Sequence, residues 1–213
     1  MNGVRLSIIS DTHLQQDRIA MGAGDVMIHC GDMLNLACDS DAELARVDDW
    51  FGDQRFDAVL CTGGNHDWAL QRRVETGAVA FANARYLQDA GWEYRGLKFY
   101  AAPWVPDLPR HAFHAPDRVL RRKWAEIPTG IDVLITHTPP AGILDVSSNG
   151  KSLGCPLLRD ELARIRPRLH CFGHVHAGAG QTRIGDTLFV NASALVSRSS
   201  HVRGAVCVTL TPF

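Results

Sequence analysis

The stretch "RLHCFGHVHAG", residues 168–178, joins an apolar run to two histidines. Residues 168–172 have the length and apolar character of a buried strand, and His174 and His176 follow with one residue between them. Side chains two positions apart in an extended chain point to the same side. We therefore expect both imidazoles to face one spot beyond the end of a strand.

Four other apolar runs end in residues of the same kind. They cover residues 4–10, 25–30, 56–63 and 131–137, and each reads as a strand. In open α/β sheets, sites form outside the carboxyl ends of the strands. The side chains at these ends, which we expect to face His174 and His176, are Asp11, His13, Asp32, Asn65 and His137.

The segments between these runs predict helices alternating with strands in one domain, residues 1–213. Ser40 and Glu43 form a capping box before apolar residues at helical spacing, which predicts a helix over 40–53. The remaining expected elements are helices over 117–127 and 156–165, hairpins turning at 95–96 and 185–186, and a last strand over 205–210. The first part is typical of parallel β-α-β units, and the last part resembles antiparallel hairpins.

Composition excludes several classes of function. The chain has 213 residues and a formal net charge of −1, which argues against duplex nucleic acid or an anionic membrane as a bulk electrostatic partner. No apolar run approaches the length of a membrane span, and the first residues lack the features of a signal peptide. The six cysteines show no paired spacing, which indicates reduced thiols and a cytoplasmic protein.

The mixture of imidazoles and carboxylates predicts a transition-metal site. Such donors suit Zn, Mn, Fe or Ni better than Ca or Mg. Seven ligands are too many for one tetrahedral ion but suit two ions that share a carboxylate, and Asp32, which follows a glycine, is the natural bridge. Two ions about 3.5–4 Å apart hold the attacking and leaving oxygens of a phosphoryl displacement and lower the pKa of a bridging water.

Five motifs in order, "DTH", "GD", "GNHD", "THTPP" and "GHVH", resemble the signature of the calcineurin-like metallophosphoesterase superfamily. The segments "YLQD", "PW", "RPRLHCFGHVHAG" and "VNAS" are similar to those of its small metallophosphoesterase-domain-containing proteins, so the resemblance covers nearly the whole chain. It implies an α/β fold in which a mixed two-sheet β-sandwich is flanked by helices, a four-layer αββα arrangement.

The resemblance also implies a role for each motif residue. One ion would be held by Asp11, His13, Asp32 and His176, and the other by Asp32, Asn65, His137 and His174, with Mn favoured. His66 would protonate the leaving-group oxygen, and Asp67 would hold its imidazole. Leu14 stands where many relatives carry glycine, so we expect a narrower approach to the ions.

Each motif taken alone also has a purely structural interpretation. A Gly-Asp or D-x-H after a strand is often a turn or a cap, and His137 could be a hydrogen-bonded strand-end histidine. His29 and His170 are expected to be packed within strands and His201 to lie at the surface, whereas His111 and His114 are ambiguous.

Residues 102–118 contain four prolines and predict a long loop that could overhang the site. Trp104 and Phe113 could stack on a nucleobase, and Arg110 could touch phosphate. The alternative is that Trp104 belongs to the core and the prolines stiffen a surface turn. Asn35 either contacts substrate or shapes its turn.

These observations favour a phosphodiesterase that cleaves small phosphodiesters such as cyclic nucleotides, by attack of a metal-bridging hydroxide with His66 as general acid. A phosphomonoesterase or a nuclease would use the same motifs, although the small size and weak charge disfavour a dedicated nuclease. The other class is a nucleotide-binding regulatory or scaffold protein with little turnover. Such a protein would have lost a ligand or the proton donor, and this sequence lacks neither.

Overall fold

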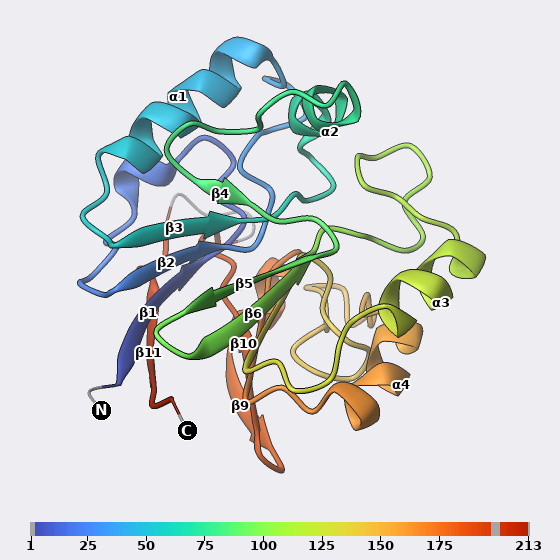
Figure 1. The fold of residues 1–213 in the computed structure, drawn as a ribbon. Coiled ribbons are helices and arrows are strands. Elements are labelled where there is room, and N and C mark those ends of the chain that lie inside the picture. Colours follow the sequence, from blue (N-terminus) through green and yellow to red (C-terminus); the bar gives the residue numbers. More distant parts are fainter. Residues whose placement is uncertain (1–2, 197–200, 213) are drawn as a thin grey trace.

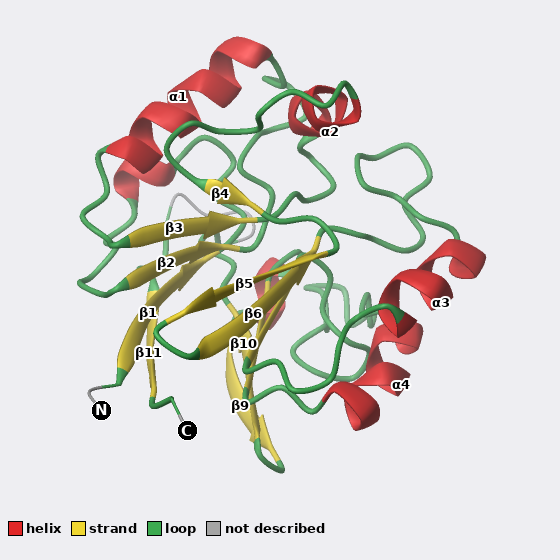
Figure 2. Cartoon of the chain, in the orientation of Figure 1, coloured by secondary structure: helices red, strands yellow, loops and turns green. Residues whose placement is uncertain are grey.

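The computed structural model describes residues 3–196 and 201–212 and contains two β-sheets that pack face to face (Figure 1; Figure 2). Helices cover both outer faces: α1 and α2 lie against the first sheet, and α3 and α4 lie against the second. The architecture is the α/β sandwich of two mixed sheets flanked by helices that the resemblance implied.

The first sheet has the order β11-β1-β2-β3-β4. Its strands are β1 (Val4–Ile9), β2 (Val26–His29), β3 (Ala58–Cys61), β4 (Arg85–Tyr86) and β11 (Val206–Leu210). Neighbouring strands from β1 to β4 are parallel, and β11 closes the edge by antiparallel pairing with β1. The carboxyl ends of the first three strands therefore meet at one edge of this sheet.

The second sheet has the order β5-β6-β7-β8-β10-β9. Its strands are β5 (Ala90–Tyr94), β6 (Leu97–Ala102), β7 (Val133–Thr136), β8 (Leu169–Phe172), β9 (Gly180–Ile184) and β10 (Thr187–Asn191). Both expected hairpins are present, as β5-β6 and β9-β10. The last part of the chain is antiparallel in the β9-β10 hairpin and in β11, as expected, and β10 pairs in addition parallel to β8.

Helices α1 and α4 begin at the capping box and at the proline that the sequence places there. In α1 (Asp41–Gly52), the Ser40 hydroxyl accepts a hydrogen bond from the Glu43 N–H at 3.3 Å, as the capping box predicts. The expected helices α3 (Asp117–Ala125) and α4 (Pro156–Ile165) are present. Sequence analysis missed α2 (Trp68–Glu75), which begins directly after the "GNHD" motif. Two short 3-10 turns cover Gln16–Arg18 and His176–Gly178.

Packing on both faces explains why the central strands are apolar without alternation. In β2, Ile28 faces the core between the sheets, whereas Met27 packs beneath α1 and α2. In β7, Ile135 faces the inner core and Leu134 packs with Trp124 beneath α3 and α4. Strands covered on both sides need apolar residues at every position. The two sheets thus form a rigid support for the loops at their ends.

The structure also describes the cysteines and the lengths of the helices. All six cysteines lie within the described residues, and none of them forms a disulfide. In the described part of the chain, no helix has the length and apolar character that crossing a membrane requires.

His170 is a buried histidine away from the ends of the strands, and its protonation can be tested through stability. Its Nε2–H donates to the Thr136 hydroxyl at 2.9 Å, and its ring contacts those of Phe172 and Phe189. Burial lowers the pKa of His170 to about 3, so the unfolded chain binds the extra proton as pH falls below about 6.5. The contribution of neutral His170 to stability is complete above that pH and is lost progressively toward pH 3.

We expect wild type to lose about 2 kcal/mol more unfolding free energy than His170→Leu between pH 7 and pH 5. Urea unfolding of both metal-free proteins at the two pH values measures this difference. Buried groups shared by both proteins, such as His29, cancel in the comparison. Equal losses would show that His170 is protonated in the folded state.

Candidate metal centre

All seven expected ligands come together where five strands end. Asp11 and His13 follow β1, Asp32 follows β2, Asn65 follows β3, His137 follows β7, and His174 and His176 follow β8. The two sheets meet directly at this edge, since the Ser10 N–H donates to Ala192 at 3.0 Å and the Ala194 N–H donates to Ser10 at 2.8 Å. Ligands from both sheets therefore share one location.

The loops at this edge have unusual backbone conformations. Positive φ angles occur at Asp11 (54°), His13 (43°), Leu14 (63°), Asp32 (56°) and His174 (68°). Residues other than glycine rarely adopt this region, and such strain gathers at functional sites. Hydrogen bonds between the loops hold the strained backbone, because the His13 N–H donates to the Asp32 carbonyl at 3.1 Å.

Two motif glycines allow the loops to approach this closely. A Cβ at Gly64 would lie 2.3 Å from Asp32 Oδ1, and a Cβ at Gly173 would lie 2.1 Å from Asp11 Oδ2. Neither position has room for any side chain. This explains physically why "GNHD" and "GHVH" both begin with glycine.

A first group of donors consists of Asp11, His13 and His176. His176 Nε2 lies 3.4 Å from Asp11 Oδ1 and 3.4 Å from His13 Nε2. His13 Nδ1–H donates to the Leu34 carbonyl at 2.9 Å, which leaves the Nε2 lone pair directed into the group. Such an anchored imidazole is typical of a metal ligand.

A second group consists of Asp32, His137 and His174, with Asn65 between the two imidazoles. Asn65 Oδ1 lies 2.9 Å from His137 Nε2 and 2.8 Å from His174 Nδ1. His137 Nδ1–H donates to the Cys30 carbonyl at 2.9 Å, so its Nε2 also faces inward.

Asp32 lies between the two groups. Its Oδ2 is 3.4 Å from His137 Nε2 in one group and 3.8 Å from His13 Nε2 in the other. Its side chain is buried, and Oδ1 accepts the backbone N–H of His66 at 2.8 Å. One carboxylate oxygen is thus available to both groups.

The charges of the buried groups favour a cation. Burial would raise the pKa of Asp11, but the hydrogen bond and charge of His176 and its other imidazole neighbours outweigh it and hold the pKa well below its usual range. Asp32 behaves in the same way, through His137 above all. Burial, reinforced by His137, lowers the pKa of His174 to about 4 and keeps that imidazole neutral. Against burial, Asp32 and Asp11 raise the pKa of His137 to about 9, and Asp11 raises that of His176. These imidazolium groups therefore neutralise the buried carboxylates, a role that a divalent ion would take over.

A family model described as calcineurin-like phosphoesterase matches residues 4–178, which contain every residue of both groups. The chain belongs to the calcineurin-like phosphoesterase family. Members of this family typically bind divalent metal ions, and the donor groups described above fit such ions.

Individual relatives agree with this assignment. Human metallophosphoesterase domain-containing protein 1 is 33% identical over 97% of this chain and 71% of its own length. A UPF0046 protein of Caenorhabditis elegans is 34% identical over 90% of this chain and 75% of its own length. Among solved structures, TT1561 of Thermus thermophilus has a TM-score of 0.61 at 13% identity, covering 89% of this chain and 88% of that one. The structural likeness supports the fold.

Asn191 and Ser193 support Asp11 and the loop that carries His174 and His176, and sequence analysis did not single them out as site residues. The Ser193 hydroxyl donates to Asp11 Oδ2 at 2.8 Å, and the Ser193 N–H donates to Asn191 Oδ1 at 3.1 Å. The Asn191 amide donates to the Val175 carbonyl at 2.9 Å, between the two histidines of "GHVH". Their signal is "VNAS", polar residues at the carboxyl end of β10.

The expectation that Asp67 holds the His66 imidazole is wrong. The buried Asp67 carboxylate accepts backbone N–H groups from Asp32 at 2.9 Å, Gly64 at 2.9 Å and Leu34 at 2.8 Å. His66 Nδ1 has no hydrogen-bond partner. Burial and the charge of Asp32 raise the pKa of Asp67 to about 8, against the backbone hydrogen bonds. Asp67 therefore supports the loop that carries Asp32.

We expect Asp67→Ala to lower the free energy of unfolding by about 3 kcal/mol, since three buried N–H groups lose their acceptor. Urea unfolding of the metal-free protein measures this loss. Asp49→Ala, a change of a carboxylate on α1, serves as the control and should alter stability by less than about 0.5 kcal/mol. If both variants were equally stable, Asp67 would not support the loop.

His66 stands at the solvent side of the centre. Its side chain is 27% exposed, and its Nε2 lies 3.8 Å from Asp32 Oδ2. Burial lowers the pKa of His66, so its imidazolium gives up a proton readily. His13, Asp32 and His66 also lie close enough together to hold an ion, so distance alone permits either a ligand or a proton donor.

The structure excludes the stacking considered for Phe113 and favours the packing alternative for Trp104. Phe113 is 1% exposed, and its ring packs where a side chain on Gly63 would lie, so it cannot stack on a base. Trp104 donates its indole N–H to Asp89 at 2.7 Å, and the Lys123 ammonium lies 5.0 Å from the centre of its ring. Trp104 therefore belongs to the packing around α3, the alternative interpretation.

The loop 102–118 nevertheless reaches the centre. The Ala112 N–H donates to the Asn65 carbonyl at 3.1 Å, and this places the His111 ring 6.3 Å from the His66 ring. Asn35 Oδ1 accepts the Ala37 N–H at 3.2 Å, which is the turn-shaping alternative. Leu14 is partly buried beside His13, and Arg110 is exposed. Substrate contacts of Leu14 and Arg110 remain predictions.

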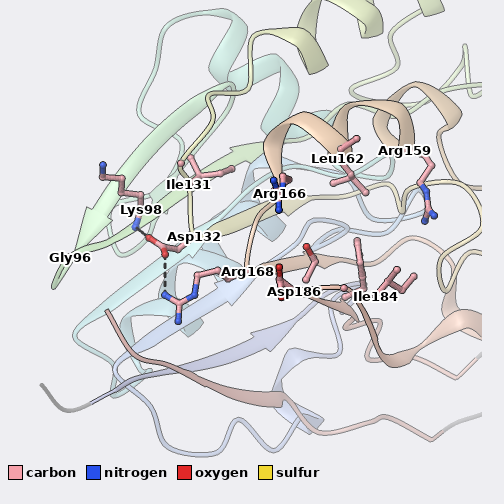
Figure 3. A pocket seen from close by; sticks show the side chains of 15 residues that line it. Gly96, Lys98, Ile131, Asp132, Arg159, Leu162, Arg166, Arg168, Ile184 and Asp186 are labelled. Atoms are coloured by element: carbon pink, nitrogen blue, oxygen red, sulfur yellow. Dashed lines mark hydrogen bonds and ion pairs between the residues drawn. The ribbon is translucent and has the colours of Figure 1, made fainter. Parts of the chain in front are cut away.

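A sizeable cavity lies away from the candidate metal centre. It has a volume of about 870 Å³ and lies near the amino ends of β6, β7, β8 and β10, the opposite edge of the sheet. Figure 3 shows Arg159 and Leu162 of α4, with Arg166 directly after that helix, along one wall, and Ile184 and Asp186 of the β9-β10 hairpin along the other. No residue of either donor group lines it.

Proposed function

We propose that this protein is a phosphodiesterase that hydrolyses small phosphodiesters, such as cyclic nucleotides, with two divalent transition-metal ions. The observation that carries the proposal is the pair of donor groups on either side of Asp32. This arrangement occurs within a family of phosphoesterases.

Two sets of residues would hold the ions. One set is Asp11, His13, Asp32 and His176, and the other is Asp32, Asn65, His137 and His174. Nitrogen and oxygen donors together suit Mn, Fe, Zn or Ni, and we favour Mn. When bound, a pair of such ions supplies a water of lowered pKa and neutralises charge on the phosphoryl group.

His66 would donate the proton that the leaving oxygen needs. It is the most exposed of the histidines around Asp32, and its Nδ1 makes no hydrogen bond that would fix it as a structural group. The proton would pass from the imidazolium to the departing oxygen as the P–O bond breaks.

The charges around the centre support a diester rather than a monoester. Among the described residues, the ion pairs of Asp11 and Asp32 are all with histidines, so no lysine or arginine pairs with these two carboxylates. A diester carries one negative charge, whereas a monoester carries nearly two at neutral pH and gains more from a cationic side chain.

The test combines metal analysis with two substrates. Protein reconstituted with Mn should contain about two ions per chain and hydrolyse bis-p-nitrophenyl phosphate faster than p-nitrophenyl phosphate. Elemental analysis and nitrophenolate release at saturating Mn measure both. Full activity with one tightly bound ion would contradict the dinuclear centre, and a clear preference for the monoester would contradict the diester assignment.

A further inference from the structure

We infer that a small hollow beside His174 and His176 binds an uncharged apolar group, one ring in size, on the ester that stays with phosphorus. This inference rests on the proposed function and, among small phosphodiesters, favours those with an apolar ester substituent over cyclic nucleotides. The hollow is lined by Ser147, Ser148 and Leu153 on one side and by residues 174–177 on the other.

The position of the hollow ties it to the metal centre. His176 belongs to the first donor group and His174 to the second, so the hollow opens where the two groups meet. A phosphorus atom held between the groups would direct one of its substituents toward this space. His66 lies near Asp32 and next to the ring of His13, and it does not line the hollow.

The size of the hollow limits what it accepts. Its volume is about 230 Å³, whereas a closed cavity of ~150 Å³ holds one benzene ring. A single ring or a short branched chain therefore fits, and a complete nucleoside would extend beyond it. The two histidines are the only ionisable side chains in its lining, which favours an uncharged group.

Two exposed apolar side chains lie on the loop that lines the hollow. Among the described residues, Val146 (52% exposed) and Leu153 (42%) lie on the loop after β7, and Leu153 itself lines the hollow. An exposed apolar side chain in the wall of a hollow offers a contact surface for an apolar group.

The loop that carries Leu153 is held firmly. The buried Asp145 carboxylate accepts the N–H groups of Gly142 at 3.0 Å and Gly154 at 3.1 Å and the hydroxyl of Ser152. The Leu153 N–H itself donates to the Asp145 carbonyl at 3.0 Å. Leu153 is therefore positioned before any ligand arrives, which reduces the entropy lost on binding.

Two substrates with the same leaving group and charge test the inference. Mn-loaded protein should cleave p-nitrophenyl phenylphosphonate with a kcat/KM about tenfold above that for p-nitrophenyl methylphosphonate, because the phenyl ring is partly buried. Leu153→Ser should reduce this ratio to about two or less, and Ser148→Trp, which fills the hollow, should do the same. The control Val79→Ser, at an apolar residue 77% exposed on the 76–84 loop, should keep the wild-type ratio.

A binding measurement separates this inference from the proposed function. Calorimetry of the Mn-loaded protein should show phenylphosphonate binding about tenfold more tightly than methylphosphonate, with the difference lost in Leu153→Ser. If neither ester were hydrolysed, the proposed function would fail, and the affinities of the two phosphonates would still show whether the hollow binds the phenyl ring. If both esters were hydrolysed equally and the two phosphonates bound equally, the hollow would be rejected and the function would stand.

Discussion

The Asp32→Asn protein is expected to lose both metal ions together and to hydrolyse bis-p-nitrophenyl phosphate at least about 10³-fold more slowly than wild type. Asp32 Oδ2 faces His13 Nε2 at 3.8 Å and His137 Nε2 at 3.4 Å, one from each donor group. Removing its charge therefore weakens both sites at once, while an amide of the same shape preserves the packing.

Two further variants make the Asp32 result specific. Asp11→Asn changes a carboxylate that lies in the first donor group only, so it should reduce Mn content by about one ion per chain. Asp160→Asn removes an exposed carboxylate on α4 and should leave Mn content and activity unchanged. Elemental analysis and kcat measure all three. If Asp32→Asn lost one ion, as Asp11→Asn does, Asp32 would serve a single site.

The His66→Asn protein is expected to keep its metal ions and to lose activity according to the leaving group. A poor leaving group, such as the alkoxide of a nucleoside 3′,5′-cyclic phosphate, needs protonation as the bond breaks, whereas p-nitrophenolate leaves without it. General acid catalysis is worth about 10²–10⁴-fold, so the loss should be larger by a factor in this range for the cyclic nucleotide. Values of kcat for both substrates and elemental analysis measure the effect.

The same variant tests whether His66 is a ligand. His66 lies close enough to Asp32 and His13 to hold an ion with them. A ligand variant would lose metal and slow both substrates equally, and either result would refute the role as acid. Asp67→Asn is not expected to show this dependence on the leaving group, because the Asp67 carboxylate contacts the backbone N–H groups of Asp32, Leu34 and Gly64 rather than the His66 imidazole.

Much of the fold was predictable because its signals are local. The apolar runs and capping residues that predict the β1 to β3 strands, α1 and α4 lie within the elements themselves. The parallel pairing of β10 with β8 was not predictable in this way. The turn at 185–186 determines only how β10 pairs with β9, whereas pairing with β8 depends on contacts between residues far apart along the chain.

The sequence by itself determined which donor side chains follow the strands, and the common edge of parallel strands is sufficient to bring Asp11 and Asp32 together. His174 follows a strand of the second sheet and joins them only because the two sheets meet at this edge. Only the tertiary structure decided the partners of the residues around them. Asp67 binds the N–H groups of Leu34 and Asp32, which lie 33 and 35 positions away, and Phe113 fills the space beside Gly63. The physical reason is that the type of a residue limits which partners it can bind. Its burial and its actual partner depend on which distant part of the chain the fold places beside it.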